Sequence, residues 1–157
     1  MKPSGITLED VRKWAKDMEN WNLKRLFEET FDENVEWTFS SPSDGPLGQT
    51  SPVSGVYTSR EQVMKHIVTP IMARFVEPRF KYELIDLFIQ PSEMNDPAER
   101  HLTKAVVELK ASGVLKKNRQ DWVNYIAYIL HFDNQTKKVV KLKSYQDSAA
   151  INKAFEE

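Results

Sequence analysis

Residues 121–132, DWVNYIAYILHF, decide the fold, because their pattern is that of a strand with two apolar faces. In an extended chain, successive side chains point to opposite sides of the sheet. One face carries Trp122, Asn124, Ile126, Tyr128, Leu130 and Phe132, and the other carries Val123, Tyr125, Ala127, Ile129 and His131. Since both faces are mainly apolar, the pattern predicts a central strand that is covered on both sides.

A second strand follows after a short turn. Residues 133–137, DNQTK, favour a turn, because Asn and Asp side chains bond to their own backbone and tolerate left-handed conformations. In the segment that follows, Val140, Leu142 and Ser144 alternate with Lys141, Lys143 and Tyr145. The pattern predicts a long antiparallel hairpin over residues 121–147, and we expect the other elements to pack on it.

The chain before this hairpin begins with helix signals. Thr7, with Asp10 three residues later, predicts the N-cap of an amphipathic helix over about residues 8–20. Asn22 predicts the cap of a shorter second helix. The alternation from Val35 to Phe39 then predicts a half-buried strand.

Residues 41–55, SPSDGPLGQTSPVSG, predict a long loop, either the rim or lid of a site or a surface loop without a role. Ser59 then caps a third helix, which should kink or restart at Pro70, because proline cannot donate a backbone hydrogen bond. Strands are predicted from about residue 80 to 88 and from 103 to 112. The C-terminal SAAINKAFEE favours a short helix or a frayed tail.

Composition limits the classes of function. A length of 157 residues predicts a single domain over residues 1–157, and the net charge of -1 offers no basic surface for nucleic acid. Cysteine is absent, which excludes disulfides and thiol nucleophiles. The N-terminal MKPSGITLED has no apolar segment of signal-peptide length, and the longest apolar run is too short for a membrane helix. We therefore expect a soluble, cytoplasmic protein with no membrane partner.

Helices followed by a run of strands indicate an α+β domain with helices packed on one face of a curved sheet. The segments VEWTF (35–39), SGVYTSREQV (54–63), AVVELKASGV (105–114) and NYIAYILHFDNQTKKVVKLKSYQD (124–147) occur in that order. This series resembles the SnoaL-like branch of the nuclear transport factor 2-like (ketosteroid isomerase-like) superfamily. The resemblance extends over nearly the whole chain.

The resemblance implies a cone-shaped, cystatin-like domain whose curved antiparallel sheet carries the N-terminal helices on its concave face, around a deep apolar pocket. It implies a cofactor-independent isomerase, cyclase or dehydratase of secondary metabolism, acting on a small apolar, polyketide- or terpenoid-like molecule. The alternative is a non-catalytic ligand-binding or protein-interaction domain of the same fold. Cyclases of the family carry an aspartate near the position of Tyr128, and epoxide hydrolases carry one near Ser144. Neither Tyr128 nor Ser144 is a carboxylate. The resemblance therefore implies the same fold but does not imply these two reactions.

Three polar residues are candidate catalytic groups. Asp86 lies between Leu84 and Phe88, and a buried carboxylate there would have a raised pKa suited to proton transfer. The alternative is a solvated or paired carboxylate at a strand end. Tyr128 and Asn124 share one face of the central strand, where they could polarise a carbonyl group or simply be satisfied by backbone groups.

Candidate substrate-binding residues are mostly large and apolar, with two polar additions. They are Trp14, Trp21, Trp37, Tyr57, Met72, Phe88, Glu108 and Ser144. The alternative for the aromatic residues is plain core. Glu108 lies on the more polar face of its strand, and this alternation favours a solvated carboxylate.

Metal and nucleotide chemistry have no support in the sequence. His66, His101 and His131 are dispersed, and the glycines form no phosphate-binding pattern, so we expect no metal and no cofactor. The face of the central strand that carries Val123, Tyr125, Ala127 and Ile129 has too much apolar surface to leave in water. We therefore expect a homodimer that pairs through the sheet.

Overall fold

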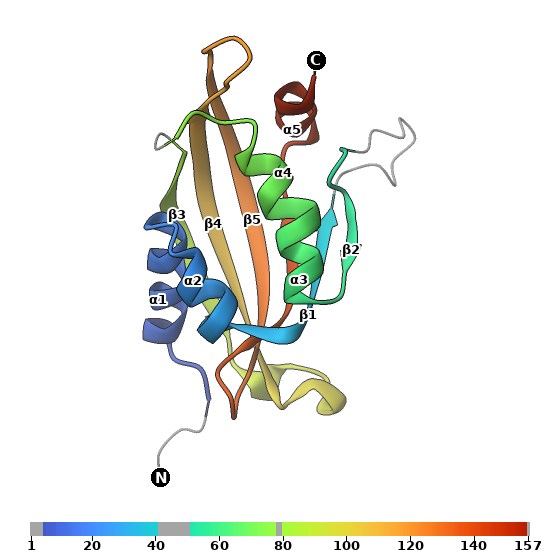
Figure 1. Cartoon of the computed structure of the whole chain (residues 1–157). Coiled ribbons are helices and arrows are strands. Elements are labelled where there is room, and N and C mark those ends of the chain that lie inside the picture. Colours follow the sequence, from blue (N-terminus) through green and yellow to red (C-terminus); the bar gives the residue numbers. More distant parts are fainter. Residues whose placement is uncertain (1–4, 41–50, 78–79, 157) are drawn as a thin grey trace.

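The computed structural model describes residues 5–40, 51–77 and 80–156, and its centre is one curved, unclosed sheet (Figure 1). The strands are β1 (Phe31–Ser40), β2 (Gly55–Tyr57), β3 (Lys81–Gln90), β4 (Leu102–Val114), β5 (Asp121–Asp133) and β6 (Val139–Tyr145). Their order in the sheet is β2-β1-β6-β5-β4-β3. All neighbours are antiparallel except β1 and β6, which run parallel. The predicted α+β class and the central hairpin, β5 with β6, are confirmed.

The helices lie together on one face of this sheet, which we call the inner face (Figure 1). They are α1 (Leu8–Glu19), α2 (Leu23–Arg25), α3 (Arg60–Val63), α4 (Thr69–Met72) and α5 (Ser148–Phe155). Single π-helical stretches continue α2 over Leu26–Thr30 and join α3 to α4 over Met64–Val68. Two short 3-10 turns, Ser92–Met94 and Pro97–Glu99, connect β3 to β4.

The predicted helix caps are present. The backbone N–H of Asp10 donates to Thr7 Oγ1 at 3.2 Å, and the N–H of Thr7 donates to the Asp10 carboxylate at 2.8 Å. Asn22 caps α2 by accepting from the N–H of Arg25 at 3.2 Å. Each contact satisfies backbone donors that a helix N-terminus leaves without partners. These local signals therefore place the helix starts correctly.

The predicted restart at Pro70 takes the form of a change of helix type. Ser59 caps α3, the chain then passes through the π-helical stretch, and α-helical geometry resumes at Thr69 with Pro70 in the first turn. A first turn tolerates proline, because its backbone N–H has no partner within the helix there. The helix thus continues past Pro70 to Met72.

Two segments differ from the expected pattern. The first strand begins at Phe31 rather than Val35, with a register irregularity between Phe31 and Glu36. Gly55–Tyr57, expected to end a loop, forms a short strand that pairs with β1. Most of the predicted loop over residues 41–55 lies outside the described residues, and so does the rim or lid hypothesis attached to it.

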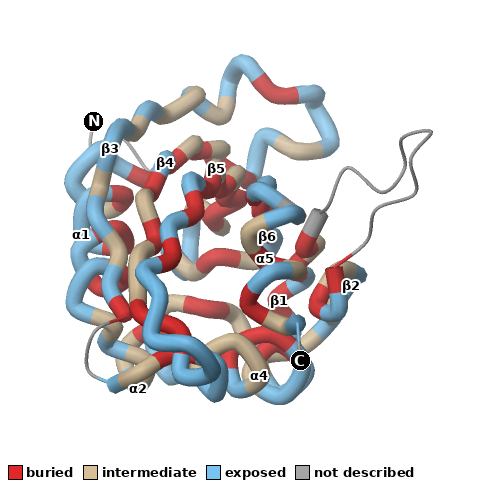
Figure 2. Tube along the Cα trace, turned by 90° about the horizontal axis from the view of Figure 1, so that it is seen from above, coloured by how far each residue is buried: buried red, intermediate tan, exposed pale blue. Residues whose placement is uncertain are grey.

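The core lies between the inner face and the helices (Figure 2). Leu109, Leu130 and Leu142, from three neighbouring strands, are fully buried there. On the opposite, outer face, Val123 is 44% exposed and Tyr125 is 56% exposed. The prediction that β5 is covered on both sides therefore holds on the inner face only, within the described chain. No helix of that part of the chain is long and apolar enough to cross a membrane.

Candidate functional site

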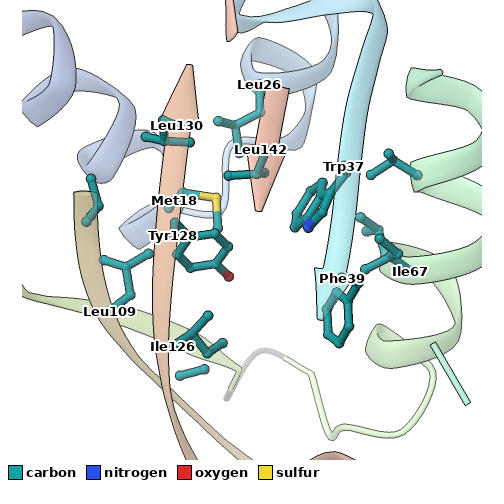
Figure 3. Close-up of a cluster of buried hydrophobic side chains, with 14 of the residues drawn as sticks. Met18, Leu26, Trp37, Phe39, Ile67, Leu109, Ile126, Tyr128, Leu130 and Leu142 are labelled. Carbon is teal, nitrogen blue, oxygen red and sulfur yellow. The ribbon is translucent and has the colours of Figure 1, made fainter. Parts of the chain in front are cut away.

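The candidate site is a narrow apolar pocket between the inner face of the sheet and the helices. Its lining consists of Trp21, Trp37, Phe39, Ile67, Val68, Ile71, Met72, Phe80, Tyr82, Ala111, Trp122, Ile126, Tyr128 and Ile151. The free volume of the pocket is about 30 Å³. Figure 3 shows Tyr128 on β5 and Trp37 on β1 projecting into the same space. The side chains themselves therefore fill most of the pocket.

The polar centre of this lining is a pair of phenols, Tyr82 on β3 and Tyr128 on β5, whose hydroxyls are hydrogen-bonded to each other. Burial raises the pKa of Tyr82 to about 12, even though the bond from Tyr128 lowers it. Burial, the neighbouring Tyr82 and the same hydrogen bond raise the pKa of Tyr128 well above its ordinary value. Both phenols are therefore neutral near pH 7, and one of their two hydroxyl protons remains available to donate.

Aromatic neighbours and the sheet hold this pair in place. The ring of Tyr128 meets the ring edges of Trp14 and Trp37, with centroids 5.5 and 6.3 Å away. Tyr82 packs against Trp21 at 5.2 Å and against Phe80 at 5.2 Å. Ring contacts of this kind restrict side-chain rotation. The two hydroxyls are therefore positioned by packing rather than by charge.

A buried hydrogen bond lies beside the pocket on the β1–β6 side. Trp37 Nε1 donates to Ser144 Oγ at 2.9 Å, and both residues are buried. Ser144 is also directly opposite Tyr128 in the β5–β6 register. The serine thus orients the indole that forms one wall of the pocket.

The helix α5 closes one side of the pocket with Ile151. Trp122 Nε1 donates to the carbonyl oxygen of Ala150 at 2.7 Å, and the backbone N–H of Asp147 donates to Asn124 Oδ1 at 3.0 Å. Asp147 in turn caps α5, because its side chain accepts from the N–H of Ala149. These contacts tie the start of α5 to the inner face of β5.

No charged side chain and no histidine lines this pocket among the described residues. The same part of the chain contains no group of three or more His, Asp or Glu residues that could hold a metal ion. The pocket can therefore donate hydrogen bonds from its tyrosine hydroxyls to a ligand in apolar surroundings.

Four of the candidate residues predicted from the sequence line the pocket, namely Tyr128, Trp37, Met72 and Trp21. Others lie directly behind it. Trp14 is buried core, Ser144 bonds to Trp37, and Asn124 anchors Asp147. Asn124 Nδ2 is buried without a hydrogen-bond partner within the described chain.

The inward placement of Asp86 and Phe88 is wrong. The β3–β4 register shifts between Leu84 and Asp86, so that Ile85 is an extra residue in β3. Because such a bulge reverses the alternation beyond it, Leu87 and Ile89 turn inward instead. Asp86 is exposed and Phe88 is 58% exposed on the outer face. Asp86 is therefore the solvated carboxylate of the alternative interpretation and does not line the pocket.

Two further residues that were predicted to bind substrate do not line the pocket. Glu108 is exposed on the outer face, as its alternation favoured, and it does not line this pocket. Tyr57 is half-buried, donates its hydroxyl to the carbonyl oxygen of Val53 at 2.8 Å, and stacks on His66. Its contacts are those of a residue that stabilises the strand-to-helix connection.

Tyr82 and Trp122 belong to the pocket but were not nominated. Tyr82 shares an alternating, inward-facing pattern with Phe80, and this pattern was the available signal. In the sheet, Ala111 lies between Tyr82 and Asn124 in one row, and its small side chain leaves room beside the tyrosine. Only the folded register shows that Tyr82 reaches Tyr128.

Comparison with solved structures shows the same fold. A nuclear transport factor 2-like protein from Burkholderia thailandensis matches with a TM-score of 0.67 and 13% identity, over 95% of this chain and 96% of that chain. Bal32a, from a soil-derived mobile gene cassette, matches with a TM-score of 0.68 and 15% identity, over 94% and 95%. BvnE pinacolase from Penicillium brevicompactum matches with a TM-score of 0.63 and 14% identity, over 93% and 89%.

The chain therefore has the nuclear transport factor 2-like, or ketosteroid isomerase-like, fold, as its sequence predicted. This fold is compatible with isomerase activity. At identities of 13% to 15%, the fold is what these proteins share. No protein-family model matches the sequence, and no curated protein is similar to it.

Proposed function

We propose that the chain binds a small, flat, apolar molecule with an oxygen acceptor, and acts on it as a cofactor-independent isomerase, cyclase or dehydratase. The observation that carries this proposal is the Tyr82–Tyr128 phenol pair within an otherwise apolar pocket. Trp21, Trp37 and Trp122 supply flat walls. A ligand oxygen atom beside this pair would accept a hydrogen bond from the hydroxyl that the Tyr82–Tyr128 bond leaves free to donate.

Such a donor stabilises negative charge that develops on the ligand oxygen, most effectively where water is excluded. Since no carboxylate or imidazole lines the described pocket, the pair supports reactions driven by polarising an oxygen. Rearrangement, ring closure and loss of a polarised hydroxyl belong to this class. Reactions that require a carboxylate to remove a proton have less support.

Ligand entry requires side chains to move, because the free volume is small. Met72 is suited to this, since its unbranched thioether side chain repacks easily. Ile151 belongs to the short helix α5 and can shift with it. The similar structure named a pinacolase supports enzymatic chemistry on this fold.

A second candidate is a non-catalytic binding protein that uses the same pocket. The lack of a carboxylate, lysine, arginine or histidine in the pocket lining of the described chain favours it. In that case Tyr82 selects ligands that carry an oxygen acceptor but transforms none of them. The two candidates share the binding step and differ in what happens afterwards.

Binding is tested with a matched pair of ligands, a bicyclic aromatic ketone and the hydrocarbon of the same shape. Quenching of tryptophan fluorescence reports occupancy, because Trp21, Trp37 and Trp122 line the pocket. We expect the ketone to bind roughly tenfold more tightly, and Tyr82→Phe to remove that preference. Tyr125→Phe, on the outer face, is the matched control. A ketone preference that persists in Tyr82→Phe would contradict the role of Tyr82.

Catalysis is tested by incubating the protein with ketones, diols and tertiary alcohols of the same size. Isomerisation or ring closure conserves the mass and changes the carbon NMR spectrum, whereas dehydration removes one water. We expect Tyr82→Phe to slow turnover by roughly 100-fold, as for the loss of one donor to a developing oxyanion. Ligands that bind and are recovered unchanged establish the binding protein instead.

A further inference from the structure

Three tryptophans line the inner pocket, and two of them donate their indole N–H to the protein. Trp37 Nε1 bonds to Ser144 Oγ, and Trp122 Nε1 bonds to the carbonyl oxygen of Ala150. Trp21 Nε1 is also buried, but it has no hydrogen-bond partner within the described chain. An indole N–H can only donate, and leaving such a donor buried without an acceptor costs stability. The unpaired N–H of Trp21 therefore requires an explanation.

The backbone of Trp21 is unusual as well. Its φ of 49° lies in the left-handed region, which is unfavourable for a residue with a Cβ. Trp21 follows Asn20, the C-cap of α1, and its N–H donates to the carbonyl oxygen of Met18 at 3.0 Å. The N–H of Asn22 donates to the carbonyl oxygen of Asp17 at 2.9 Å. These two bonds form a Schellman motif, a helix end where glycine is usual, so the tryptophan is held there against a backbone preference.

The indole of Trp21 packs against the phenol pair. Its ring centroid is 5.2 Å from that of Tyr82 and 5.8 Å from that of Phe80. Tyr82 in turn is hydrogen-bonded to Tyr128, and all four residues line the pocket. The indole N–H and the free phenol hydroxyl are thus two donors beside one apolar space. Residues that hold an unfavourable backbone conformation cluster at ligand-binding sites, which gives both oddities of Trp21 a common reason.

We propose that Trp21 Nε1 is a second ligand-binding donor of this pocket, and that the ligand is a flat, neutral molecule with two oxygen acceptors. One acceptor receives the phenol hydrogen bond, and the other receives the indole hydrogen bond. This inference rests on the proposed function of the pocket and narrows its ligand class to diketones and hydroxyketones. A ligand with a single acceptor leaves one donor unpaired, which lowers its affinity. Because no lysine, arginine or histidine lines the described pocket, neutral oxygen atoms suit it better than a carboxylate.

Ligand affinity tests the second donor. Isothermal titration calorimetry compares a bicyclic aromatic ketone with diketones of the same ring system, whose second carbonyl is on the adjacent, alternate or opposite ring carbon. We expect at least one diketone to bind roughly tenfold more tightly than the ketone, and Trp21→Phe to remove that gain. Trp37→Phe is the matched control, because the N–H of that indole is already bonded to Ser144. It should lower both affinities and keep their ratio, and circular dichroism confirms that each variant is folded.

The outcomes separate this inference from the function on which it rests. Preference for the ketone over the hydrocarbon of the same shape depends on the phenol pair alone, so it should persist in Trp21→Phe. A ketone preference without any gain for the diketones would overturn the role of Trp21 and leave the phenol site standing. The same holds for a diketone gain that survives Trp21→Phe. A protein that binds none of these ligands would overturn both.

NMR of the indole protons observes the proposed hydrogen bond directly. The chain has four tryptophans, so an isotope-labelled sample should show four indole N–H signals, which single phenylalanine substitutions assign. Saturation with the tightest diketone should move the Trp21 signal downfield, because its N–H gains an acceptor. The signals of Trp37 and Trp122 should move little, since their acceptors are already in place. A Trp21 signal that stays in place at saturation would contradict the proposal.

Discussion

The two faces of the sheet are built from the same strands and have opposite chemistry. Inner positions of β4, β5 and β6 include Leu109, Leu130 and Leu142, all fully buried. Outer positions of the same strands carry lysine, glutamate and half-exposed apolar residues in rows. Because side chains alternate along a strand, one stretch of sequence specifies a core on one side and a partly exposed, charged surface on the other. The difference shows that the packing that stabilises the chain is concentrated on the inner face.

The largest expected effect is the loss of stability when a side chain is truncated, which should be large on the inner face and small on the outer face. Leu142→Ala on the inner face removes a fully buried side chain and should lower the free energy of unfolding by about 3 kcal/mol. Val123→Ala on the outer face, 44% exposed, should cost less than about 1 kcal/mol. Urea unfolding at low protein concentration measures both. Equal losses would show that the outer face is covered within one chain.

A smaller loss of stability is expected when a serine hydroxyl is removed, and it too should differ between the two faces. Ser144→Ala leaves the buried Trp37 Nε1 without its acceptor and should cost about 1 to 2 kcal/mol. Ser112→Ala, at a half-buried outer position of β4, is the matched substitution and should change the stability little. The same urea experiment compares them, and red-shifted tryptophan emission in Ser144→Ala alone would locate the change. If Ser144→Ala costs nothing, Trp37 has another acceptor.

The smallest effect concerns pH and the outer face. Burial, Lys104, Lys141 and Lys143 lower the pKa of His131, and Glu99 opposes them. The folded state therefore favours the neutral imidazole, and this contribution to stability is present above the ordinary value of 6.5 and is lost as pH falls through the lower folded value. His131→Gln should flatten this part of the pH dependence of unfolding.

The control for this prediction is His66→Gln, at an exposed position of the π-helical stretch Met64–Val68. It changes the same side-chain chemistry away from the outer face, so the wild-type slope should persist. An unchanged slope in His131→Gln would mean that other groups control acid unfolding.

Much of the fold could be predicted from sequence because its signals are local. The alternation in residues 121–132 and the caps at Thr7, Asn22 and Ser59 depend on neighbours a few residues away. Each therefore predicted the correct element. The parallel pairing of β1 with β6 has no local signal, because it joins segments far apart in the chain.

The site was predicted less well, for two physical reasons. One extra residue, Ile85, forms a bulge in β3, and beyond it the side chains that would have pointed inward point outward. The neighbouring residues give no sequence signal for this bulge. Alternation alone therefore predicted an inward position for Asp86. Tyr82 matters because its hydroxyl meets that of Tyr128, a contact between strands that are not adjacent in the sheet. Alternation indicates which side chains turn inward, and only the folded register shows which of them touch.

The parallel pairing of β1 with β6 also affects how fast the chain can fold. Strands β3 to β6 pair with their sequence neighbours, whereas the hydrogen-bonded Trp37 and Ser144 are 107 residues apart. Closing so long a loop costs chain entropy before any contact compensates for it, and such pairings slow folding. The meander from β3 to β6 can therefore assemble first, with β1 docking on its finished edge. In that order of assembly, the pocket is completed by the docking of β1, because Trp37 and Tyr128 both line it.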